Sequence, residues 1–153
     1  MRYWLLKSEP EAYSIDDLKR QNVGMWDGVR NYAARNNIRM MEKGDLAFFY
    51  HSSAAMIGIA GIAEVARTAY PDPTQFQKNA DHYDPKATTE RPIWYAIDMR
   101  FKRKFKTLIP LAVLKNDPKL NTMLVVQKGS RLSVQEVKEK DFTYIMNMYA
   151  QDI

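Results

Sequence analysis

Hydrophobic and polar residues alternate most regularly over residues 93–105, IWYAIDMRFKRKF. A period of two is typical of a β-strand, because successive side chains point to opposite faces of a sheet. The apolar face of this predicted strand carries Tyr95, Ile97, Met99, Phe101 and Phe105. The polar face carries Trp94, Asp98, Arg100, Lys102 and Lys104. Trp94 is therefore the single aromatic residue on the polar face.

Four other segments are predicted to be strands. Residues 46–51 (LAFFYH) and 56–67 (MIGIAGIAEVAR) carry apolar residues on both faces, as strands that are covered on both sides do. Residues 3–6 (YWLL) and 131–137 (RLSVQEV) predict shorter strands.

Helical signals lie between and after these strands. Ser14 followed by Asp17 is a carboxylate variant of the capping box and predicts a short helix. Apolar residues then recur at helical spacing over residues 30–41. Two further helices are predicted near 110–115 and 138–149.

Together these elements predict an α+β fold. The helices do not alternate regularly with the strands, so a doubly wound parallel sheet is not favoured. Five to six strands with short flanking helices indicate a small, strongly curved sheet or barrel. The length of 153 residues fits one domain over residues 1–153.

Composition excludes several classes of protein. Without cysteine there is no disulfide framework, thiolate nucleophile or cysteine zinc site. No apolar run approaches the ~20 residues that span a bilayer, and the N-terminus lacks a secretory signal, so no membrane association and a cytoplasmic location are expected. The net charge of +5 favours a polyanionic partner such as nucleic acid.

Catalytic patterns are scarce. His51 and His82 are the two histidines, and neither belongs to a metal-ligand motif such as HExxH. Glycine-rich phosphate loops and a nucleophile elbow are missing as well. We therefore expect no metal, no cofactor and no enzymatic activity.

Aromatic and polar residues gather instead at the ends of the predicted elements. The candidate ligand-binding residues are Lys7, Ser8, Trp26, Arg30, Asn31, Tyr32, Tyr50, His51, Ser52, Trp94 and Arg131. Flat aromatic faces with a few hydrogen-bonding groups suit a planar base. Trp26 is expected to stand at a turn with one ring face open, followed by Arg30 and Asn31 as donors. The alternative is that these aromatic residues cap a small core.

Several motifs resemble the EVE domain family over essentially the whole chain. They are WLLKSEP, MWDGVRNYAARN, FFYHS, GIAEV, YPDPTQF and RLSVQ, in this order. The resemblance implies a PUA-like curved β-barrel related to YTH domains. Two positions depart from the family pattern: Glu136 stands where proline is usual, and Lys138 where a Thr or Ser helix cap is usual. Both are expected to affect the start of the last helix more than a pocket.

The resemblance also implies a function. Family members are non-catalytic modules thought to recognise modified bases, with modified cytosine in DNA favoured over RNA. Trp26 in GMW is similar to the first cage tryptophan of YTH domains. In duplex nucleic acid the base would have to be flipped out to reach such a pocket.

Two other functions remain open at this stage. PUA-like relatives of the ASCH type include metal-independent ribonucleases, and Lys7, Tyr32 and Tyr50 could serve such a reaction. Alternatively, the chain is an RNA-binding accessory protein, or its barrel binds a small metabolite. An RNA-cleavage assay in EDTA separates the enzyme from the binding module.

Two surfaces complete the sequence-based picture. Arg100, Lys102 and Lys104 form a basic strand face that is expected to attract the phosphate backbone. A solvated strand edge is an equally good explanation of these cations. The irregular segment 70–91, which is rich in proline, aspartate and asparagine, predicts a long loop. The resemblance implies that this loop lies over the mouth of the pocket.

Overall fold

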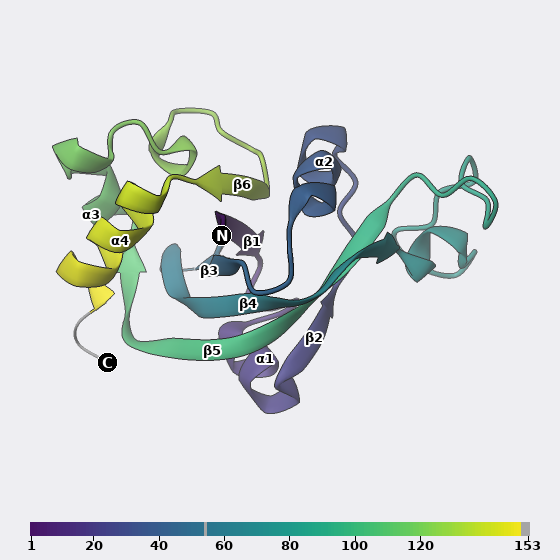
Figure 1. Cartoon of the computed structure of the whole chain (residues 1–153), viewed down its shortest axis with the longest axis horizontal. Helices are drawn as coiled ribbons and strands as arrows, with labels where there is room; N and C mark the ends of the chain where they lie inside the picture. The colour runs from purple at the N-terminus through teal and green to yellow at the C-terminus, as the bar shows by residue number, and fades with distance from the viewer. Residues whose placement is uncertain (54, 151–153) are drawn as a thin grey trace.

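Two long strands form a twisted antiparallel ribbon that runs across the molecule (Figure 1). They are β4 (Gly58–Pro71) and β5 (Tyr95–Pro110), paired from Gly58 opposite Pro110 to Pro71 opposite Tyr95. Several register shifts interrupt the pairing, and such bulges increase strand twist. The predicted alternation of β5 is confirmed, but both strands extend further than the sequence indicated. As a result, β4 takes up the first two residues of the predicted loop 70–91.

The computed structural model describes residues 1–53 and 55–150. Within these residues the ribbon belongs to a mixed six-stranded sheet with the order β2-β5-β4-β3-β1-β6. The other four strands are β1 (Tyr3–Ser8), β2 (Val23–Trp26), β3 (Leu46–His51) and β6 (Val134–Val137). β1 and β3 are parallel, and the remaining pairs are antiparallel.

The α+β class and the strand number are confirmed, whereas the sheet is not closed into a barrel. β2 and β6 lie at its two edges. The sequence did not predict β2, because four residues that include a glycine carry little strand signal on their own. Pairing with the long β5, from Val23 opposite Arg100 to Trp26 opposite Ile97, stabilises this short strand.

The helices at the start of the chain agree with the capping signals. α1 (Ile15–Gln21) begins with the predicted capping box, in which Ser14 and Asp17 exchange hydrogen bonds. α2 (Tyr32–Met40) begins after Asn31, whose side chain accepts a hydrogen bond from Ala34 N.

Two further α-helices and three short 3-10 helices lie elsewhere in the described chain. They are α3 (Leu111–Lys115), α4 (Glu139–Met148), η1 (Pro73–Phe76), η2 (Pro118–Leu120) and η3 (Leu124–Val126). α4 begins after Lys138 without a side-chain cap, as expected from the departure at this position. No helix among the described residues is both long and apolar enough to cross a membrane.

Alternate residues of the central strands pack into two separate apolar clusters. Trp4, Leu6 and Phe49 belong to one cluster, together with residues of α1 and α2. Leu5 and Phe48 belong to the other, together with residues of α3 and α4. Because successive strand residues point to opposite faces, the two clusters lie on opposite faces of the sheet. This arrangement explains why β3 is apolar on both faces.

Candidate functional site

A cavity of about 470 Å³ opens beside the end of β2. Its volume is within the about 300–1,000 Å³ that is typical of small-molecule sites. Three separate parts of the chain form its wall: the end of β1 with the turn after it, the end of β2 with the turn after it, and two single residues from later loops. The lining residues are Lys7, Ser8, Glu9, Ala12, Tyr13, Met25, Trp26, Asp27, Gly28, Val29, Arg30, His82 and Ser133.

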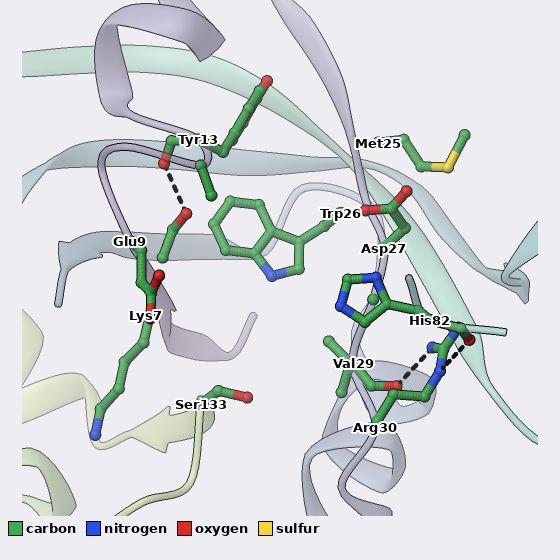
Figure 2. Close-up of a pocket in the computed structure, with 13 residues that line it drawn as sticks. Lys7, Glu9, Tyr13, Met25, Trp26, Asp27, Val29, Arg30, His82 and Ser133 are labelled. Atoms are coloured by element: carbon green, nitrogen blue, oxygen red, sulfur yellow. Dashed lines mark hydrogen bonds between the residues drawn. The ribbon is translucent and has the colours of Figure 1, made fainter. Parts of the chain in front are cut away.

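Trp26 forms the central part of this wall. In Figure 2 its indole lies between Lys7 and Glu9 on one side and Asp27 and His82 on the other. The expectation that Trp26 stands at a turn is wrong, since it is the last residue of β2 and only 8% exposed.

Aromatic neighbours hold the indole of Trp26 edge-on. The ring of Phe49 lies 5.2 Å from it between centroids. The ring of Tyr13 lies 6.1 Å from it. Such T-shaped pairs are favourable beyond the area they bury. The indole is therefore a fixed wall, anchored in the core and in contact with the cavity.

Gly28 brings the turn after β2 directly against the loop that carries His82. Its φ of +76° lies in the left-handed region that favours glycine. A Cβ at this position would also lie only 2.9 Å from the His82 ring. The backbone N–H of Gly28 donates to Asp72 at 2.8 Å. Both the conformation and the close approach therefore require glycine here.

Arg30 connects the same turn to the loop, and every N–H group of its guanidinium donates a hydrogen bond within the protein. Nε and Nη2 donate to the His82 carbonyl, Nη2 also to Thr74 Oγ1, and Nη1 to Asp72 and to the Val29 carbonyl. A guanidinium has five N–H donors, and these five bonds occupy all of them. Arg30 was predicted to offer donors to a ligand, but in this structure it clamps two parts of the cavity wall together.

Asp72 is the buried acceptor at the centre of this clamp. One carboxylate oxygen accepts from Gly28 N and Arg30 Nη1, the other from Thr74 N and Thr74 Oγ1. Burial by itself would raise the pKa of Asp72, but the hydrogen bonds from Thr74, Gly28 and Arg30 outweigh it and lower the pKa. Asp72 is therefore an ionised carboxylate whose four acceptor positions are filled.

Other polar groups at the cavity keep hydrogen-bonding capacity. Lys7 donates one hydrogen bond of 3.3 Å to the Ser130 carbonyl, and burial lowers its pKa. Partial enclosure raises the pKa of Asp27, and the nearby Asp72 carboxylate adds to the increase. Ser8 also lines the cavity, but its hydroxyl donates to the Tyr13 carbonyl at 2.6 Å.

Three of the predicted site residues lie beside the cavity wall and do not line it. Asn31 caps α2. Tyr32 is 59% exposed and stacks on Trp94, with 4.9 Å between ring centroids. Trp94 is buried immediately before β5, and its indole N–H donates to Asp84 at 2.8 Å. Trp94, with Tyr32 stacked on it, is thus bonded to the loop that carries His82.

The predicted residues from the ends of β3 and β6 also lie outside the lining. Tyr50 is buried in the cluster on the opposite face, and burial raises its pKa to about 12. His51 Nε2 accepts from Ile15 N at 3.1 Å, and Ser52 N donates to the Ser8 carbonyl at 2.9 Å. Arg131 is exposed. None of these four side chains contributes to the cavity wall.

The basic face of β5 is largely paired with acidic side chains. Arg100 lies 3.3 Å and Lys102 3.9 Å from Glu64 oxygens, and Lys104 lies 2.7 Å from Asp16. These exposed ion pairs reduce the positive charge that the face presents to phosphate. The predicted role of these three residues in backbone contact stays a prediction.

Sequence reasoning did not assign several lining residues, including Glu9, Tyr13, Asp27, His82 and Ser133. Asp27 and Gly28 lie inside the motif MWDGVRN, which marked this segment as a candidate site. Nothing in the motif showed that they line the cavity while the neighbouring asparagine does not. His82 comes from the loop predicted to lie over the pocket. Its place in the wall depends on hydrogen bonds from Arg30 to its carbonyl, which the sequence does not reveal. In the described chain, no three His, Cys, Asp or Glu side chains gather as a metal site would require.

Comparison with known proteins identifies the family of this chain. The model of the EVE domain matches residues 2–148. The chain belongs to the EVE domain family. Human thymocyte nuclear protein 1 is 42% identical over 166 residues, which cover 95% of this chain and 73% of the human protein.

Several solved structures are similar to this chain over nearly its whole length. A protein from Pseudomonas syringae is 49% identical, with a TM-score of 0.93 over 95% of this chain and 97% of its own. Human thymocyte nuclear protein 1, solved in complex with DNA containing 5-methylcytosine, is 41% identical with a TM-score of 0.91 over 96% of each chain. A YTH domain from Zygosaccharomyces rouxii, 16% identical with a TM-score of 0.54 over 99% of this chain and 90% of its own, shares the fold alone.

Proposed function

We propose that this EVE domain is a non-catalytic module that binds nucleic acid by holding one modified base, a modified cytosine in DNA, in the cavity beside Trp26. The observation that carries the proposal is the fixed indole in the wall of a cavity large enough to hold a base. The complex of human thymocyte nuclear protein 1 with 5-methylcytosine DNA supports the same ligand class.

The cavity combines the two properties that base recognition needs. Stacking of a base on an aromatic side chain is worth about 1–3 kcal/mol. Apolar wall residues such as Ala12 and Val29 offer contact to a methyl group, while Lys7 and Asp27 offer hydrogen bonds to a base edge. A target base in duplex DNA reaches this cavity after it is flipped out of the stack.

The positions of the candidate catalytic groups favour binding over ribonuclease chemistry. Lys7 lines the cavity, but Tyr50 is buried in the opposite cluster and Tyr32 lies outside the lining. Burial also raises the pKa of Tyr50 to about 12, which makes its phenolate rare at neutral pH. Lys7 Nζ lies 5.9 Å from the centroid of the Tyr50 ring, but Tyr32 stacks on Trp94 outside the lining, so the three side chains do not form one catalytic group.

Fluorescence anisotropy tests the proposal with matched DNA duplexes that carry one 5-methylcytosine or one cytosine at the same position. Burying one methyl group contributes about 0.8 kcal/mol, so we expect roughly fourfold tighter binding of the methylated duplex. EDTA in the buffer and a gel of the recovered strands, run for an RNA of the same sequence as well, test for cleavage. Equal affinity for the two duplexes, or turnover of the RNA, would contradict the proposal.

A pair of variants links the preference to the cavity. Ala12→Leu enlarges an exposed residue of the wall and is expected to remove the preference for the methylated duplex, because it fills space that the base needs. Glu11→Leu places the same side chain at the preceding exposed residue, outside the lining, and should bind as the wild type does.

A further inference from the structure

Asp27 and Glu9 are the two carboxylates in the cavity lining, and no other residue in the described part of the chain donates a hydrogen bond to either side chain. Asp72, by contrast, accepts four hydrogen bonds. Asp27 lines the cavity, directly follows Trp26 in the chain and is exposed to solvent. Figure 2 shows Asp27 and His82 on the same side of the indole. A ligand stacked on Trp26 therefore finds an available acceptor beside it.

The clamp explains why this acceptor is Asp27 and why Arg30 does not take part. All five N–H donors of Arg30 are bonded within the protein, so the arginine next to the site offers nothing to a base edge. Glu9, the other carboxylate in the lining, belongs to the turn after β1 on the far side of the indole. Lys7 is a donor and cannot accept from an amino group.

We propose that Asp27 determines which bases enter the cavity by accepting a hydrogen bond from the exocyclic amino group of the base, so that 4-aminopyrimidines bind and 4-oxopyrimidines are rejected. The inference rests on the proposed function, which supplies a base in this cavity. Carboxylates accept from the N4 amino group of cytosine. Thymine and uracil present an O4 acceptor at the same position, which leaves two acceptors face to face.

This preference depends on the protonation state of Asp27. Partial enclosure and the neighbouring Asp72 raise the pKa of Asp27. When ionised, Asp27 accepts from the amino group with either oxygen; when protonated, it still accepts with its carbonyl oxygen and can also donate to the ring N3 of cytosine. Both forms are complementary to the Watson–Crick edge of cytosine, but the protonated form also pairs with the edge of thymine, by donating to O4 and accepting from N3–H. The ionised form repels the O4 oxygen of thymine, because both groups are hydrogen-bond acceptors.

The test compares 5-methyl-2′-deoxycytidine with thymidine by calorimetry or NMR titration. The two nucleosides carry the same C5 methyl group and differ only along the edge that Asp27 is proposed to read. We expect the wild type to prefer 5-methyl-2′-deoxycytidine by roughly tenfold, because one well-placed contact of this kind discriminates by about that factor. In Asp27→Asn the preference should fall toward unity, since an amide can present either its oxygen or its amino group.

Matched measurements separate the possible failures. Asp81→Asn removes the same charge from an exposed position in the loop that carries His82, outside the lining, and should keep the wild-type preference. Melting curves of both variants verify that the fold is kept. If the wild type binds 5-methyl-2′-deoxycytidine but Asp27→Asn keeps the full preference, the inference is wrong while the proposed function stands. If the wild type binds neither nucleoside nor the methylated duplex, both are wrong.

Discussion

Asp72→Asn is expected to lower the free energy of unfolding by about 3–5 kcal/mol, the cost of breaking a buried ion pair by removing one partner. Asp72 is fully buried, and the substitution replaces one of two acceptor oxygens with a donor among the N–H groups of Gly28, Thr74 and Arg30. The lower end of the range applies because the Arg30 side chain is 21% exposed. Urea unfolding of the variant and the wild type measures the difference.

Base binding should weaken together with stability in this variant. The clamp holds the His82 loop against the turn after β2, so its loss removes part of the cavity wall. Asp81→Asn, an exposed change in the same loop, should leave both unfolding and binding unchanged. Retained stability and wild-type affinity in Asp72→Asn would show that the clamp does not position the wall.

The contribution of Asp72 to stability also depends on pH, and its lowered pKa determines the direction of this dependence. A carboxyl whose pKa is lower in the folded than in the unfolded protein stabilises the fold above its unfolded pKa, near 3.9. That stabilisation is lost as the pH falls through the lower, folded pKa. The difference in stability between wild type and Asp72→Asn should therefore be full at pH 7 and should shrink below about pH 4.

Trp4→Ala is expected to lose about 3–5 kcal/mol of the free energy of unfolding, as large core aromatics do on truncation. Trp4 is fully buried in β1, between β3 and the edge strand β6, and its indole N–H donates to the buried Asp45 at 3.0 Å. Such a loss is a large fraction of the total stability of a domain of this size. Thermal or urea unfolding gives the measurement.

Trp4→Phe is the matched control for this variant. It keeps most of the buried ring and loses the hydrogen bond to Asp45, so a smaller loss of stability is expected. If Trp4→Ala unfolds with nearly wild-type stability, the assignment of Trp4 to the core is wrong.

Local patterns were sufficient to predict most of the secondary structure. The alternation in β5, the capping box of Ser14 and the two-faced apolar pattern of β3 each follow from neighbouring residues. β2 was missed because its stability comes from pairing with β5, more than seventy residues away along the chain. The open edges of the sheet likewise depend on long-range pairing that periodicity does not encode.

The candidate site was predicted only in part, because its contacts also join segments that are distant along the chain. Lys7, Ser8, Trp26 and Arg30 were expected near a ligand and do line the cavity. Residue type, however, does not show whether a polar group is already satisfied. Arg30 and Asn31 are good donors and acceptors in the sequence, yet the structure uses them for the clamp and the α2 cap. Asp27 was left unassigned although it remains available.

Trp26 requires a different kind of test from Trp4. The sequence predicted that Trp26 stands at a turn with one ring face open, but Trp26 packs in the core cluster as well as lining the cavity. Its removal is therefore expected to cost stability as well as stacking. Loss of binding in Trp26→Ala would not separate the two effects, so the wild-type protein is the better reporter.

The three indole N–H groups of the wild type provide that reporter. Trp4 donates to Asp45 and Trp94 to Asp84, whereas no residue in the described part of the chain accepts from the Trp26 indole. Each group gives a separate resonance in a ¹H–¹⁵N correlation spectrum, which Trp→Phe variants assign. During titration with 5-methyl-2′-deoxycytidine, the Trp26 resonance should shift until saturation while that of Trp4 stays in place. Saturable binding that leaves the Trp26 resonance unmoved would contradict a base stacked on this indole.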